Sequence, residues 1–160
     1  EQAGRYRRKL LVATMVAGDD PEMAERIRRH QQDRGPEWQT VEEPFHLRQV
    51  LADRAETVDV IVVDCLTLWL TTGLLRDLTD ETIQREVDQL AAVVCSLPVP
   101  VILVANEVGL GIVPATPLSR RFRDLAGWTN QRLAAACTEV YFLAAGLPLR
   151  LKGDKELRRP

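Results

Sequence analysis

Apolar residues in this chain gather in short continuous runs, separated by segments with helical periodicity. Such runs occupy residues 10–15, 58–64 and 99–105, and they are typical of parallel strands that are covered on both faces. Residues 38–42 alternate weakly between apolar and polar positions, which predicts a further short strand. The pattern therefore predicts a sheet with several buried strands.

The segments between these runs have the apolar spacing of helices. Asp20 can cap a helix, Pro21 fits its first turn, and Gly35-Pro36 would end it. Further helices are predicted over residues 45–55, 66–78, 80–97 and 118–136, and a closing strand pair over residues 139–145 and 147–152. Strands that alternate with helices indicate an α/β fold with a mostly parallel, doubly wound sheet, in a single domain over residues 1–160.

The composition excludes several classes of protein. The chain has 160 residues with 21 basic and 23 acidic side chains, and its basic residues are scattered among acids, so we expect no nucleic-acid partner. The longest apolar run, residues 90–105, is shorter than the roughly 20 residues of a membrane span and contains two prolines. Three widely spaced cysteines fit a reducing compartment. We therefore expect a cytoplasmic protein.

Ligands of open parallel sheets bind beyond the carboxyl ends of the strands. Asp64 ends the apolar strand 58–64, which is the setting of a Walker B acid that reaches Mg²⁺ directly or through water. An aspartate that caps the following turn would have the same local pattern, so both interpretations stay open. The expected companion motif, G-x-x-x-x-G-K-[ST], is absent from residues 1–160.

The first residues of the chain bear on this missing motif. Residues 1–8 resemble the end of a helix that leads into the strand 10–15. We therefore expect the first strand of the fold and its phosphate-binding loop to lie upstream of residue 1, either cut off or left out through disorder; true loss of the loop is the alternative.

A histidine on the predicted helix 20–34 is a candidate nucleophile. His30 continues the thin apolar stripe of Met23 and Ile27, with Arg26 and Arg34 one turn to either side. Two guanidinium groups would favour the neutral, nucleophilic imidazole and would attract phosphates. A partly buried histidine with a structural role is the alternative.

The predicted helix 118–136 has two distinct faces. One is an apolar core stripe of Phe122, Ala126, Thr129, Leu133 and Cys137. The other carries small and polar residues around Gly127, which costs about 1 kcal/mol in mid-helix relative to alanine. We therefore expect another group to approach Gly127 closely, either a ligand or packing partner or a second subunit.

Three motifs together carry a resemblance to one family, and the match extends from Leu10 almost to the end of the chain. They are Arg26-Ile27-x-x-His30-x-x-x-Arg34 with Trp38-x-Thr40-x-Glu42, Asn106-Glu107-Val108-Gly109-x-Gly111-Ile112-Val113-Pro114, and Phe122-Arg123-Asp124-x-x-Gly127-x-x-Asn130-Gln131-x-Leu133-Ala134. In order and spacing they resemble the bifunctional adenosylcobinamide kinase / adenosylcobinamide-phosphate guanylyltransferases of cobalamin synthesis.

The resemblance implies an enzyme with two activities and a RecA-like P-loop fold. ATP or GTP would first phosphorylate the aminopropanol arm of adenosylcobinamide, and the sequence does not distinguish these two donors. GTP would then guanylylate a histidine, and GMP would pass to the phosphorylated substrate to give adenosylcobinamide-GDP. A homotrimer is expected, with Mg²⁺ as cofactor.

By position, the resemblance makes His30 the catalytic nucleophile and places Asp64 near Mg²⁺. The nucleotide would contact Thr14, Met15, Val16, Gln31, Gln32, Asp33, Arg34, Glu42 and Asp64. Two other functions remain as alternatives: a degenerate nucleotide-binding subunit with a regulatory or scaffolding role, and a generic P-loop ATPase.

Overall fold

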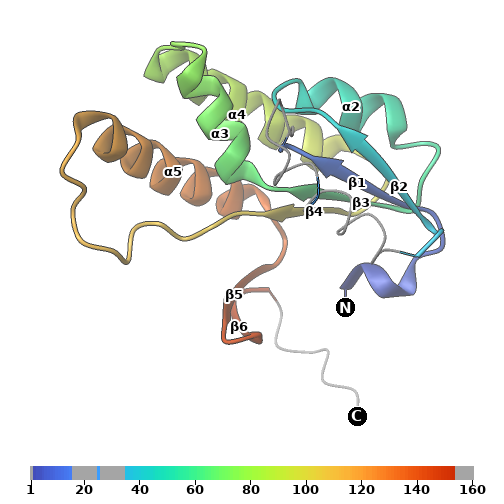
Figure 1. Ribbon diagram of the computed structural model, residues 1–160. Coiled ribbons are helices and arrows are strands. Elements are labelled where there is room, and N and C mark those ends of the chain that lie inside the picture. The colour runs from blue at the N-terminus through green and yellow to red at the C-terminus, as the bar shows by residue number, and fades with distance from the viewer. Residues whose placement is uncertain (1, 16–24, 26–34, 154–160) are drawn as a thin grey trace.

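Four parallel strands form the centre of the computed structural model, which describes residues 2–15, 25 and 35–153 (Figure 1). The strands lie in the order β2-β1-β3-β4. Their bounds are Lys9–Ala13 (β1), Trp38–Glu42 (β2), Val60–Asp64 (β3) and Val101–Val104 (β4). The three strands predicted from the apolar runs and the one predicted from weak alternation are therefore all confirmed, with ends that differ by at most two residues. Apart from Glu25, the predicted helix over residues 20–34 lies outside the described residues.

Helices follow the strands as the periodicity predicts. A 3₁₀ helix, η1, covers Gln2–Arg5, and the α-helices are Leu47–Arg54 (α2), Leu66–Leu75 (α3), Asp80–Ser96 (α4) and Pro117–Ala136 (α5). The third helix ends earlier than predicted because Asp77 adopts a positive φ of 54°. The amides of Asp77 and Leu78 then bond back to the carbonyls of Leu74 and Gly73, which closes the helix.

One face of the sheet packs against these helices. Leu10 and Val12 of β1 and Ile61 and Val63 of β3 are fully buried. They form one apolar cluster with side chains of α2, α3, α4 and α5, among them Leu47, Leu51, Trp69, Val87, Leu90 and Leu133. In Figure 1 the helices α2 and α4 lie directly over this face. Leu11 and Val60, which project to the opposite face, are also buried, as expected for central parallel strands.

The predicted closing strand pair forms a separate antiparallel hairpin of β5 (Val140–Ala144) and β6 (Leu147–Lys152). Ala145 and Gly146 both have positive φ angles, as a two-residue turn between such strands requires. The ammonium group of Lys152 donates to the carbonyls of Ala134 and Ala135 at 3.0 and 2.8 Å. The hairpin is therefore tied to the C-terminal end of α5, where a cation also complements the helix dipole.

The buried face of α5 differs in part from the predicted core stripe. The buried face of α5 consists of Leu125, Ala126, Thr129 and Leu133, whereas Phe122 and Cys137 of the predicted stripe are only partly buried.

Within the described part of the chain, no helix combines the length and the apolar character needed to cross a bilayer.

Candidate functional site

The strand register brings two carboxylates to one edge of the sheet. Ala13 is paired with Glu42 on one side and with Asp64 on the other, and Asp64 is paired with Val104. Neighbouring strands lie about 4.8 Å apart, so the backbones of Glu42 and Asp64 are separated by about 10 Å. These residues therefore form one row at the carboxyl ends of the strands.

Glu42 and Asp64 also share a face of the sheet. Residues that pair directly across a parallel ladder project to the same side, and Val12 and Val63, one position earlier, project into the helical layer. The two carboxylates therefore project away from α2–α5, on either side of Ala13. The small side chain of Ala13 thus lies between two exposed carboxylates.

Asp64 is suited to bind a hard cation. Its side chain is exposed, and α3, which begins two residues later, receives no side-chain cap. The interpretation of Asp64 as a cap for the next turn therefore does not hold. Mg²⁺ takes one or two carboxylates together with water and phosphate oxygens, so this carboxylate fits such a role. Among the described residues, no group of three or more histidine, cysteine, aspartate or glutamate residues is arranged to hold a metal.

Thr14 joins the ends of β1 and β3. Its hydroxyl accepts a hydrogen bond from the amide of Cys65 at 2.8 Å and donates to the carbonyl of Cys65 at 2.7 Å. The Asp64–Cys65 peptide bond is cis, and the amide of Thr14 donates to the carbonyl of Asp64 at 3.0 Å. Thr14 is 2% exposed, so its hydroxyl holds the backbone beside Asp64 and is not directed at solvent.

Glu43 holds the turn that follows Glu42. Its Oε1 accepts hydrogen bonds from the amides of Phe45 and His46 at 2.9 and 2.7 Å. Burial by itself raises the pKa of the Glu43 carboxyl, but the two amide donors and the nearby positive charges hold it below its usual range. The turn between β2 and α2 is thus fixed by a carboxylate that stays ionised.

The other candidate nucleotide contacts are only partly described. Met15 follows Thr14 at the same edge and is partly exposed. His30, Val16, Gln31, Gln32, Asp33 and Arg34 lie outside the described residues. The structure therefore brings together Thr14, Met15, Glu42 and Asp64, and the roles of all these residues stay predictions.

The loop after β4 begins next to this edge. The amide of Asn106 donates to Thr67 Oγ1 at 2.9 Å, and Asn130 Nδ2 donates to the carbonyl of Asn106 at 3.4 Å. Glu107 Oε1 accepts from the amide of Gly109 at 2.7 Å. Sequence reasoning misses Thr67, because its partner lies 39 residues away and no local pattern marks it.

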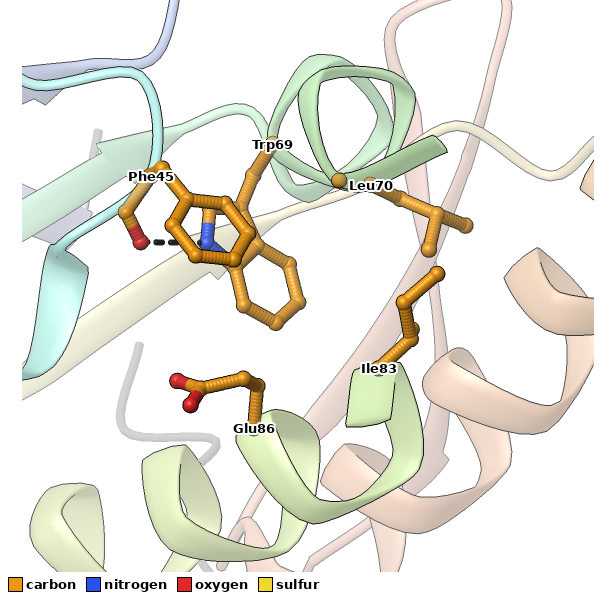
Figure 2. A pocket seen from close by; sticks show the side chains of 6 residues that line it. Phe45, Trp69, Leu70, Ile83 and Glu86 are labelled. Atoms are coloured by element: carbon orange, nitrogen blue, oxygen red, sulfur yellow. Dashed lines mark hydrogen bonds between the residues drawn. The ribbon is translucent and has the colours of Figure 1, made fainter. Parts of the chain in front are cut away.

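A depression in the surface, between α3 and α4, is lined mainly by aromatic and aliphatic side chains (Figure 2). Trp69 Nε1 donates to the carbonyl of Phe45 at 2.8 Å, and the two rings stack at 6.2 Å. The guanidinium of Arg76 lies 4.7 Å from the centre of the Phe45 ring. These contacts hold the residues that precede α2 against α3.

Gly127 has no close neighbour among the described residues. A Cβ atom built on Gly127 would meet nothing within 4 Å. The close approach predicted from this glycine is therefore not made by the described part of the chain.

Comparison with known proteins identifies similar sequences over most of the chain. The family model for cobinamide kinase / cobinamide phosphate guanyltransferase matches residues 2–151. The bifunctional adenosylcobalamin biosynthesis protein CobP of Pseudomonas aeruginosa is 46% identical over 143 residues, which cover 89% of this chain and 82% of the relative. The bifunctional adenosylcobalamin biosynthesis proteins CobU of Escherichia coli and Salmonella typhimurium are each 38% identical over 156 residues, covering 89% of this chain and 85% of each relative.

The bonds between Thr14 and Cys65 yield a first prediction. Thr14→Val keeps the side-chain shape but leaves the buried amide of Cys65 without its partner, at a cost of about 1–3 kcal/mol, whereas the carbonyl of Cys65 still accepts a hydrogen bond from the amide of Trp69. We expect the free energy of unfolding, measured by urea denaturation, to fall by about 1–3 kcal/mol. Thr14→Ser keeps the hydroxyl and should retain most of the stability. Equal stability of Thr14→Val and the wild type would show that this contact does not hold the two strands.

Proposed function

Because the chain belongs to the cobinamide kinase / cobinamide phosphate guanyltransferase family, we propose that it catalyses two consecutive steps of cobalamin synthesis. It phosphorylates adenosylcobinamide with a nucleoside triphosphate and then transfers GMP from GTP to the product, giving adenosylcobinamide-GDP and pyrophosphate. The observation that carries this proposal is the row of Glu42, Ala13 and Asp64 at the carboxyl edge of a parallel sheet, where such folds bind their ligands.

Asp64 is the residue that would hold Mg²⁺ on the triphosphate. A bound Mg²⁺ neutralises charge on the phosphate oxygens of the transferring group. The carboxylate is exposed at the end of β3, and the bonds of Thr14 to Cys65 fix the backbone next to it. Glu42 and Met15, at the same edge, would contact the nucleotide, and Val16 and residues 31–34, which lie outside the described residues, would also contribute.

His30 carries the guanylyl transfer. One imidazole nitrogen attacks the α-phosphorus of GTP, a phosphorus–nitrogen bond forms, and the bond to the β-phosphate oxygen breaks as pyrophosphate leaves. A phosphate oxygen of adenosylcobinamide-phosphate then attacks the same phosphorus and displaces the imidazole. A covalent intermediate divides one difficult displacement into two easier ones. Arg26 and Arg34, spaced one helical turn from His30 in the sequence, supply positive charge for the phosphate oxygens.

A further strand that carries the phosphate-binding loop completes the sheet and the domain. The outer edge of β4 has no partner strand among the described residues, and the β5–β6 hairpin forms no ladder with the main sheet. Leu143, Leu147, Leu149 and Leu151 of the hairpin are more than half exposed. An open strand edge and exposed apolar side chains are each normally covered in a folded protein. A parallel strand from upstream of Glu1, ending in G-x-x-x-x-G-K-[ST], would cover the open edge of β4.

The assembly and its location follow the resemblance. The active form is a homotrimer in the cytoplasm, and sedimentation of the full-length protein measures its assembly state. Support comes from the loop before α5, where Leu110 and Ile112 are 79% and 95% exposed and offer apolar area for a subunit contact.

The role of Asp64 can be tested by Asp64→Asn. We expect both transfer rates of the full-length protein, measured at saturating Mg²⁺, to fall by about 10²-fold or more, because the charge that holds the metal is lost. The melting temperature should not change, since no described residue donates a hydrogen bond to this side chain. Asp53→Asn, at an exposed position of α2, is the matched control and should keep both rates. Unchanged rates in Asp64→Asn would assign Asp64 a structural role only.

The covalent step predicts a measurable adduct. The full-length protein incubated with GTP and Mg²⁺ should gain the mass of one GMP, and the bond should be labile in acid and stable in base, as a phosphorus–nitrogen bond is. His30→Ala should abolish the adduct and the guanylyl transfer while sparing the kinase step. His46→Ala is the control, because His46 precedes α2 and packs against Phe45. An adduct that persists in His30→Ala would overturn the assignment.

The open edge of β4 predicts a difference in hydrogen exchange. The β4 amides that face away from β3 should exchange more slowly in a protein that includes the sequence upstream of Glu1 than in residues 1–160 alone. Equal exchange in the two proteins would contradict the additional strand.

A further inference from the structure

A small polar cavity lies where β4 ends, between α3 and α5. Three polar side chains, those of Thr67, Thr129 and Asn130, line it together with Asn106. The rest of the wall is apolar and consists of Leu66, Leu70 and Ala126. Its volume is about 10 Å³, close to the space that one water molecule occupies.

The cavity borders a backbone turn that two helices hold in place. Thr67 of α3 accepts a hydrogen bond from the amide of Asn106, and Asn130 of α5 donates one to its carbonyl. A carbonyl oxygen has two lone pairs, so the carbonyl of Asn106 can accept a second hydrogen bond. The position of the turn therefore depends on polar groups from both helices.

Thr129 is the unusual member of this group. Its side chain is 1% exposed, and its hydroxyl has no hydrogen-bond partner among the described residues. A buried hydroxyl is normally paired, and ordered water is a common partner in polar cavities. For comparison, the hydroxyl of Thr72 in α3 donates a hydrogen bond to the carbonyl of Leu68 in its own helix at 3.1 Å.

We propose that this cavity binds one water molecule, and that Thr129 acts through it as a positioning residue for the Asn106–Glu107 turn. The hydroxyl of Thr129 donates to the water, and the water donates to the free lone pair of the Asn106 carbonyl. Thr67 Oγ1 and the Asn130 side-chain oxygen are further acceptors in the cavity wall. These groups provide the two to four polar partners that a buried water needs.

The turn matters because of its place beside the carboxyl edge. Val104 is paired with Asp64, and Asn106 follows two residues later. A shift of the turn would therefore move backbone next to the carboxylate row. A misplacement of about 1 Å at a reacting centre can reduce a rate by up to about 10²-fold. The kinetic part of this inference rests on the proposed function, whereas the water site does not.

The test compares Thr129→Val, which has the same shape without the hydroxyl, with Thr129→Ser, which keeps it. Bound water predicts a lower melting temperature for Thr129→Val, because the water loses a partner. An unpaired hydroxyl predicts the opposite sign, because replacing it with a methyl group removes a buried polar group that has no partner. Thr72→Val is the matched control in the melting and kinetic measurements, and it should leave kcat unchanged.

Two further measurements complete the test. A high-resolution crystal structure of the wild type should show a water within hydrogen-bond distance of Thr129 Oγ1, and an empty cavity would overturn the proposal. In the full-length protein, kcat of both steps should fall roughly tenfold in Thr129→Val with little change in KM, and Thr129→Ser should restore it. Unchanged kcat in Thr129→Val would overturn the positioning role. A wild type inactive in both steps would overturn the proposed function, and the water site would still be decided by the crystal structure.

Discussion

The parallel pairing of β1 with β3 is the constraint on which the rest of the structure depends. The register places Ala13 opposite Asp64, and the hydroxyl of Thr14 then bonds both backbone groups of Cys65. Because side chains alternate along a strand, a shift of one residue would move Asp64 into the apolar layer and Val63 out of it. Burial of Val12 and Val63 and exposure of Asp64 are therefore two consequences of one register.

The helical layer and the site occupy opposite sides of the same strands. Helices α2 to α5 cover one face through a continuous apolar cluster, and the carboxylates of Glu42 and Asp64 project from the other face at the strand ends. Side chains also hold two loops at that edge: the carboxylate of Glu43 holds the turn into α2, and Thr67 of α3 and Asn130 of α5 hold the turn after β4. Rigid packing on one side thus positions polar groups on the other.

The outer edge of β4 has no partner strand among the described residues. β4 is only half buried although all four of its residues are apolar, and the leucines of the β5–β6 hairpin are exposed. Gly127 of α5 likewise has open space where a side chain would be accommodated. The three features have in common that, among the described residues, nothing covers them.

The sequence by itself determined the element types, the parallel sheet and the strand-end aspartate, because these depend on local periodicity and on the position of a carboxylate after an apolar run. The three motifs also led to the correct family, which the similar sequences confirm. Only the tertiary structure decided that the hydroxyl of Thr14 is engaged with Cys65, that Asp64 caps no helix, and that Thr67 and Thr129 flank Asn106. The reason is physical: the bonds of Thr14 to Cys65 and of Thr67 and Asn130 to Asn106 join residues 24 to 51 positions apart in the chain, and periodicity within one element carries no information about such pairs.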